Sequence, residues 1–141
     1  VVCADGTRPP WRPQTFDRVI VDVPCTGMGA LRRRPEARWR RAADDVAPLV
    51  ALQRGLLGSA LDSCRDGGVV AYVTCSPHRD ETTGVVDTVL SGRDDAVQED
   101  ARALLPDVPD LGAGPSVQLW PHRHGTDAMF LALLRRRTRG R

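Results

Sequence analysis

The sequence predicts an α/β fold built on a largely parallel sheet. Two nearly continuous apolar runs, at 18–23 and 69–75, have the composition of strands buried on both faces of such a sheet. Between them, apolar residues recur at helical spacing over 45–64. A strand, a helix and a second strand in this order form a crossover unit, which places the two strands side by side and parallel.

The remaining elements follow from local composition. Asp44 suits the cap of the first helix, and a shorter helix is expected over 80–91. The abundance of Asp, Pro and Gly in 92–116 is typical of a surface connection. Two closing strands are expected at 117–120 and 128–136, joined by the turn-rich segment "PHRHGTD".

Composition is that of an ordinary globular domain. The 141 residues suffice for one domain, and 41% hydrophobic and 27% charged residues are typical of that class. No segment approaches the ~20 apolar residues of a membrane span, and the first residues lack a signal-peptide pattern, so we expect a cytoplasmic location and no membrane partner. The four cysteines form no CxxC pair, and we therefore expect neither a metal site nor a disulfide framework.

Positive charge is concentrated in two places. The net charge is only +2, and all 20 basic residues are arginines. Six of them lie within the ten residues "RRRPEARWRR", and "RRRTRGR" ends the sequence, where 137–141 is expected to be a disordered basic tail. Because the guanidinium fork binds phosphate, such runs indicate a nucleic-acid partner, and a solvated basic face is the alternative.

The beginning of the sequence differs from its end. "VVCADG" has the pattern of a strand that is running into a loop, without the strand's start. The strand at 18–23 is apolar enough to need a neighbour on each edge, and an open apolar edge favours aggregation. We therefore expect the N-terminal half of the sheet to be missing, and residues 1–141 alone to be marginally folded.

Two cysteines stand at the ends of the two buried strands. Cys25 follows the strand at 18–23, and Cys75 ends the strand at 69–75. Ligands of open parallel sheets bind beyond the carboxyl ends of the strands, and a right-handed crossover brings both loops to one rim. Two thiols without metal spacing suggest covalent thiol chemistry. The alternative is two small buried hydrophobic residues.

Three longer segments carry a family resemblance. "DVPCTGMGALRRRPEARW" at 22–39, "YVTCSPHRDE" at 72–81 and "LWPHRHGTDAMFLALLRR" at 119–136 occur in this order. Together they strongly resemble the RNA cytosine-5 methyltransferases of the NOP/Sun (RsmB-type) family. The resemblance implies a class I (Rossmann-like) methyltransferase fold, S-adenosylmethionine as cofactor and RNA, first of all ribosomal RNA, as substrate. Residues 1–141 would then be a single unit, the C-terminal part of the catalytic domain.

The resemblance also assigns chemical roles. Carbon 5 of cytosine becomes nucleophilic when a thiolate adds at carbon 6, and a base must later remove the carbon 5 proton before the thiol can leave. By similarity, Cys75 attacks, Cys25 assists elimination, and Asp22 binds the cytosine edge and belongs to the cofactor side of the site. Asp5 matches the family's acidic residue at the adenine of the cofactor.

Other matching residues have less direct roles. Arg32 and Arg33 match a loop whose guanidinium groups can hold RNA phosphates. We interpret Trp39, in the same loop, as a packing residue rather than a base-stacking one. Glu81 matches a family glutamate, whereas Thr82 replaces the usual asparagine and weakens the expected support of the Cys75 loop.

Several alternatives stay open at this point. The family's glycine-rich cofactor loop lies upstream of Asp5 and is not in this sequence, so the upstream half is expected to be needed, in the same gene product or in trans. An inactive RNA-binding remnant is therefore the second hypothesis. A DNA cytosine-5 methyltransferase would use the Pro-Cys thiol as nucleophile, and the Thr-Cys-Ser motif argues against it. A thiol oxidoreductase is least favoured without CxxC.

Overall fold

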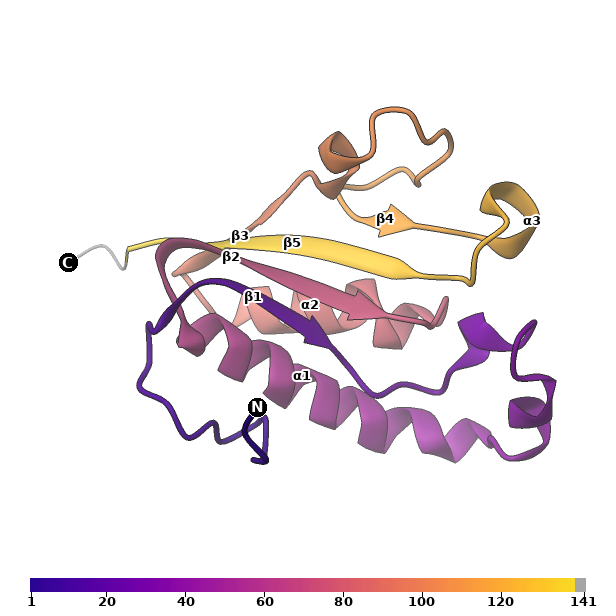
Figure 1. Cartoon of the computed structure of the whole chain (residues 1–141), viewed down its shortest axis with the longest axis horizontal. Coiled ribbons are helices and arrows are strands. Elements are labelled where there is room, and N and C mark those ends of the chain that lie inside the picture. Colours follow the sequence, from indigo (N-terminus) through magenta and orange to yellow (C-terminus); the bar gives the residue numbers. More distant parts are fainter. Residues whose placement is uncertain (139–141) are drawn as a thin grey trace.

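The computed structural model describes residues 1–138 (Figure 1). Five strands form one sheet in the order β1-β2-β5-β3, with β4 paired to β5. The strands are β1 (Phe16–Asp22), β2 (Cys64–Thr74), β3 (Ala96–Glu99), β4 (Val117–Gln118) and β5 (Phe130–Arg136). The helices are α1 (Val46–Ser63), α2 (Thr83–Ser91) and the short α3 (Pro121–His124).

The predicted crossover unit is confirmed. β1 and β2 pair in parallel, with Val21 opposite Tyr72 and Asp22 opposite Val73, and α1 connects them. The register brings the carboxyl ends of both strands to the same edge of the sheet. Strand β2 begins earlier than predicted, at Cys64, and its pairing with β1 is irregular near Phe16.

The α/β class I fold is confirmed, but a mostly parallel sheet does not describe the strands in residues 1–138. Only the β1–β2 pair is parallel there, while β5 runs antiparallel to β2, β3 and β4. The chain enters β5 at Phe130, which lies opposite Thr74 at the carboxyl end of β2. A strand that starts where its neighbour ends runs back along it, so no further crossover is needed.

The segment predicted as a surface connection, 92–116, is more ordered than its composition indicates. It contains β3, which lies beside β5, and a 3-10 turn at Ala101–Leu104. Ala101, Leu111 and Val117 form a small second core. A four-residue strand bordered by Asp residues is too short to produce a clear periodic signal, and for this reason the sequence pattern does not predict β3. Of the predicted basic tail, 139–141 lies outside the described residues.

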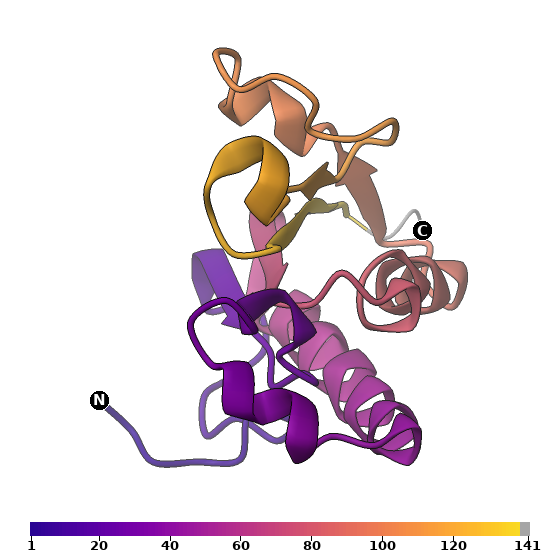
Figure 2. The same ribbon diagram turned by 90° about the vertical axis from the view of Figure 1, so that its right-hand side faces the viewer.

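The main core lies between one face of the sheet and the two longer helices. Leu57 and Leu61 of α1 and Val85 of α2 pack against Tyr72 and Leu134 of the sheet. Figure 2 shows both helices on the same side of the sheet. On the opposite face, Leu131 and Leu133 of β5 pack against a smaller cluster, whereas Ile20 of β1 is exposed.

Strand β1 differs from its predicted burial on both faces. It pairs only with β2 among the described residues, and Ile20 is 77% exposed. No helix within 1–138 has the length and apolar character that a bilayer crossing requires.

Candidate active site

The loops that follow β1 and β2 bring the two predicted cysteines together. The Sγ atoms of Cys25 and Cys75 lie 3.4 Å apart, and either thiol can donate the hydrogen bond. Both side chains are half-buried. This proximity follows from the parallel register, because Asp22 and Val73 are paired and the cysteines stand only a few residues beyond them.

Hydrogen bonding between the thiols separates their pKa values. The bond from the Cys75 thiol is the largest effect, and it lowers the pKa of Cys25 from 9.0 to about 6 against the opposing effect of burial. The Thr74 hydroxyl and the Gly27 N–H lower it further. The same bond, together with burial, raises the pKa of Cys75. The first proton therefore leaves the pair easily and the second with difficulty, which puts a thiolate beside a thiol near neutral pH.

An open cavity of about 430 Å³ exposes the pair to a ligand. The residues that line it include both cysteines and three charged side chains: Cys25, Cys75, Asp22, Arg33 and Arg41. Asp22 is exposed at the end of β1, and its charge contributes to the raised pKa of Cys75. The structure thus brings together three of the predicted site residues and one of the predicted arginines.

A buried carboxylate ties the two cysteine loops together. Glu81 has no exposed surface, and its Oε1 accepts hydrogen bonds from the Thr26 backbone N–H at 2.8 Å and from Gln53 Nε2 at 3.1 Å. Its Oε2 accepts from the hydroxyls of Thr26 at 2.6 Å and Ser76 at 2.5 Å. Because Thr26 follows Cys25 and Ser76 follows Cys75, one carboxylate fixes the residues next to both thiols.

The ionisation of Glu81 follows from these bonds. Burial raises its pKa, but the hydrogen bonds from Ser76, Thr26 and Gln53 together outweigh burial and hold the pKa of Glu81 below its ordinary value of 4.5. From the sequence, Glu81 is identified only by its match to a family glutamate. No periodicity in "TCSPHRDE" indicates that its carboxylate reaches Thr26, 55 residues away.

Gly29 makes a second connection between the loops. Its N–H donates to the Cys75 carbonyl at 3.0 Å, and its carbonyl accepts from the Ala128 N–H at 2.9 Å. A Cβ at this position would lie 2.2 Å from the Ala128 oxygen and 2.6 Å from the Cys75 oxygen. Only glycine allows this close approach, which anchors the Cys75 loop to the chain entering β5.

Arg32 and Arg33 are anchored by one buried carboxylate. Arg32 Nε lies 3.1 Å from Asp127 Oδ1. Arg33 donates to Asp127 Oδ2 twice, from Nε at 2.8 Å and from Nη2. Hydrogen bonding from Arg33 is the largest cause that lowers the pKa of Asp127. The arginine loop and the closing "GTD" turn are therefore one structural unit. Contact of these arginines with RNA stays a prediction, and their guanidinium groups remain partly exposed.

Two other predicted residues lie differently. Asp5 is exposed, is not among the residues that line the cysteine cavity, and accepts hydrogen bonds from the N–H and hydroxyl of Thr7, which lower its pKa. Trp39 is 83% exposed, so its interpretation as a packing residue is wrong. Within residues 1–138 there is no group of three or more His, Cys, Asp or Glu side chains arranged to hold a metal ion.

Comparison with known proteins finds a family model and relatives that match most of the chain. The family model described as 16S rRNA methyltransferase RsmB/F matches residues 1–135. A candidate methyltransferase of Mycobacterium tuberculosis is 62% identical over 124 residues, covering 87% of this chain and 27% of the relative. Ribosomal RNA small subunit methyltransferase B of Vibrio cholerae is 34% identical over 136 residues, covering 95% of this chain and 29% of the relative.

Two solved structures have the same fold as this chain and a related sequence. The crystal structure of PH0851 superposes with a TM-score of 0.80 at 32% identity, covering 88% of this chain and 27% of that one. NSun6 from Pyrococcus horikoshii, solved with SFG, has a TM-score of 0.68 at 27% identity, covering 84% of this chain and 29% of that one. The chain thus spans between a quarter and a third of the length of these proteins. Because the family model extends over nearly all of its residues, the chain belongs to the RsmB/F (NOP/Sun) family of methyltransferases.

Proposed function

We propose that this chain is the thiol-bearing part of an S-adenosylmethionine-dependent RNA cytosine-5 methyltransferase that acts on ribosomal RNA. The observation that carries the proposal is the pair of thiols 3.4 Å apart beside an open cavity. The family model and the Vibrio cholerae relative are both named for ribosomal RNA, which supports this substrate class. Because the chain covers only part of its relatives, the activity is proposed for a protein that contains the complete domain.

In this proposal, Cys75 is the nucleophile and Cys25 receives its proton. As the Cys75 sulfur bonds to carbon 6 of cytosine, the Cys75 proton passes along the hydrogen bond to the Cys25 thiolate. The electron pair of the C5=C6 bond becomes available at carbon 5. The low pKa of Cys25, about 6, supports this role because the acceptor is ionised near neutral pH.

Cys25 then serves the elimination. After its proton has passed to solvent, the Cys25 thiolate accepts the proton from carbon 5, the C5=C6 bond forms again and the bond from carbon 6 to Cys75 breaks. The new Cys25 S–H donates to the departing Cys75 sulfur, across the same 3.4 Å contact that joins the two sulfurs in the free protein. Asp22, at the same cavity, accepts a hydrogen bond from the cytosine edge.

S-adenosylmethionine, when bound, supplies the methyl group that carbon 5 receives. The relative solved with SFG, an analogue of this cofactor, supports its use here. Of the two acidic residues predicted for the cofactor, Asp22 fits, because its exposed carboxylate lines the cavity that contains the thiols. Asp5 stands outside that cavity, and its carboxylate is engaged by Thr7.

The test uses the complete protein, an unmodified 16S rRNA transcript and the same transcript containing 5-fluorocytosine. The methylated cytosine is located by bisulfite sequencing. We expect the wild type to form a denaturation-resistant adduct with the fluorinated RNA, and Cys75→Ala to form none. Cys25→Ala removes the hydrogen bond that chiefly raises the pKa of Cys75, so that Cys75 can lose its proton to solvent and still attack. This variant should accumulate an adduct even with ordinary RNA, because release fails. Cys3→Ala, at an exposed cysteine, is the control that should match the wild type.

Two results would contradict the proposal. If Cys75→Ala still traps RNA while Cys25→Ala does not, the roles of the cysteines are reversed and the mechanism is of the DNA methyltransferase type. If the wild type binds RNA without methylation or adducts, the inactive RNA-binding hypothesis is correct. The exposed Trp39 within the arginine-rich loop favours RNA binding in either case.

A further inference from the structure

A second cavity, of about 750 Å³, adjoins the one that contains the thiols. Thr26 and Arg41 line both cavities, so the two share a wall. The second cavity is formed by the loop after β1, the first half of α1 and the loop after β2. Its volume lies within the ~300–1,000 Å³ typical of small-ligand sites.

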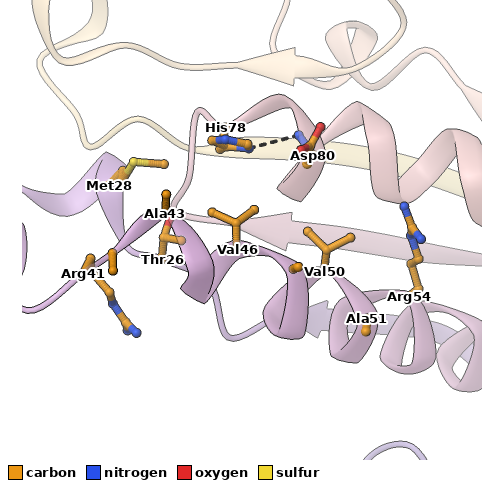
Figure 3. Close-up of a pocket in the computed structure, with 12 residues that line it drawn as sticks. Thr26, Met28, Arg41, Ala43, Val46, Val50, Ala51, Arg54, His78 and Asp80 are labelled. Atoms are coloured by element: carbon orange, nitrogen blue, oxygen red, sulfur yellow. Dashed lines mark hydrogen bonds between the residues drawn. The ribbon is translucent and has the colours of Figure 1, made fainter.

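The two long walls of this cavity have different chemistry (Figure 3). Val46 and Val50 of α1 form an apolar wall, and the His78 ring lies across from them with Met28 beside it. The ring is held in place because its Nδ1 accepts a hydrogen bond from the Asp80 N–H at 3.2 Å. A flat group between these walls would contact aliphatic side chains on one face and an aromatic ring on the other.

The charge at the rim suits a polyanion better than a neutral ligand. Arg54 lines the cavity beyond Val50 and forms no ion pair within residues 1–138. Arg41 also lines it and is 4.0 Å from its nearest acidic partner, Asp45. Asp80 is the acidic residue among those lining the cavity. The arginines therefore leave a net positive rim around an apolar slot, a combination that suits one nucleotide of single-stranded RNA.

We propose that this cavity receives the unpaired base of a nucleotide next to the target cytosine, stacked on His78. The inference rests on the proposed function and adds a subsite to it. His78 comes three residues after Cys75, and Thr26, on the shared wall, directly follows Cys25. A base in this slot therefore lies next to the thiols, where contacts to flanking nucleotides fix sequence context.

The test measures equilibrium binding of the complete protein to a synthetic RNA oligonucleotide copied from the sequence around the methylated cytosine. His78→Phe keeps an aromatic face and loses the hydrogen bond to Asp80. His78→Asn keeps a hydrogen-bond acceptor and loses the ring. We expect binding of His78→Phe within about twofold of the wild type, and binding of His78→Asn about tenfold weaker, as loss of one base–aromatic stack predicts. His122→Ala, at an exposed histidine on α3, is the matched control and should bind like the wild type.

Abasic substitution identifies the nucleotide concerned. Replacing one flanking nucleotide by an abasic one should weaken binding by the wild type about tenfold and have little further effect on His78→Asn, because the same stack is already lost. Weaker binding by His78→Phe but not by His78→Asn would mean that the hydrogen bond to Asp80 matters rather than stacking, and equal loss in both variants would mean that an aromatic face alone does not account for binding. No change in either variant would mean that another part of the protein fills the cavity, and each of these results overturns the subsite alone. A wild type that forms no adduct with 5-fluorocytosine RNA removes the proposed function and the subsite together.

Discussion

Two buried carboxylates, Glu81 and Asp95, stand at opposite ends of the sheet and are stabilised in different ways. Asp95 is fully buried near the end of β5, where Arg93 Nε lies 2.7 Å from its Oδ1 and Arg136 Nη2 lies 3.2 Å from its Oδ2. Glu81, equally buried at the cysteine end, accepts only from neutral groups, and no ion pair of Glu81 occurs within residues 1–138.

The difference shows how one kind of group can serve structure or chemistry. The charge of Asp95 is balanced by two guanidinium groups, so its electrostatic effect on the pKa values of other residues nearby is small. The charge of Glu81 is stabilised by hydroxyl and amide donors, but no positive charge balances it. It therefore acts to raise the pKa of Cys25. A carboxylate held by neutral donors can therefore position two loops and still influence the thiols beside it.

The largest effect on stability is expected at the structural end. In the complete protein, Asp95→Ala removes the buried carboxylate that Arg93 and Arg136 share, and it leaves the buried Arg136 with only the exposed carboxylates of Asp62 and Asp66 at 3.7 and 3.9 Å. Breaking such a buried pair costs about 3–5 kcal/mol in the free energy of unfolding. Urea denaturation measures the loss, and the pKa of Cys25 should stay unchanged. The control is Asp66→Ala, which removes an exposed carboxylate 3.9 Å from Arg136 and should cost at most about 1 kcal/mol. Equal losses in both variants would contradict the importance of burial.

The next effect concerns the thiol pair. Cys75→Ala removes the hydrogen bond that chiefly lowers the pKa of Cys25, so that pKa should rise from about 6 toward its ordinary 9.0. At pH 7 the thiolate fraction of Cys25 then falls roughly 100-fold, as does its alkylation by iodoacetamide. Mass spectrometry of the Cys25 peptide across pH 5 to 10 measures the shift. An unchanged midpoint would show that the contact does not set the pKa.

Close backbone approach at the cysteine end gives a third prediction. Gly29→Ala places a Cβ against the carbonyl oxygens of Ala128 and Cys75, and we expect a loss of about 2 kcal/mol in the free energy of unfolding and slower adduct formation. Gly58→Ala is the matched control, because the space at Gly58 on α1 is open and alanine favours helix. That variant should be neutral or more stable, and a stable, fully active Gly29→Ala protein would show that the loops are not held there.

The smallest shift tests the uncancelled charge itself. Glu81→Gln keeps the shape of the side chain but replaces one acceptor by an NH₂ group, which leaves a buried donor unpaired at a cost of about 1–3 kcal/mol. Loss of the negative charge should lower the alkylation midpoint of Cys25, since Glu81 raises that pKa. Asp87→Asn, at an exposed position on α2, should leave it unchanged. If the alkylation midpoint of Cys25 instead rises in Glu81→Gln, the two cysteine loops have separated. Loss of the hydrogen bond from Cys75 then raises the pKa of Cys25 by more than loss of the Glu81 charge lowers it.

The sequence by itself determined the crossover unit and the position of both thiols. Apolar runs and helical spacing are local patterns, and they locate β1, α1 and β2 because each element must bury one face. Cys25 and Cys75 stand at the ends of these strands in the sequence, and the right-handed crossover then places both loops at one rim of the sheet, without knowledge of any contact between the thiols.

Tertiary structure decided what supports those thiols and what lies beside them. The bonds from Thr26 to Glu81 and from Arg33 to Asp127 join residues 55 and 94 positions apart, and no local period records such a pair. The direction of β5 depended on where the preceding turn delivers the chain, and the ordering of 92–116 on a few buried residues such as Ala101 and Val117. The slot beside His78 exists only because α1 and the loop after β2 are packed together. Local patterns record which residues must be buried, whereas polar partners and cavities depend on which distant surfaces meet, and that is settled only when the whole domain packs.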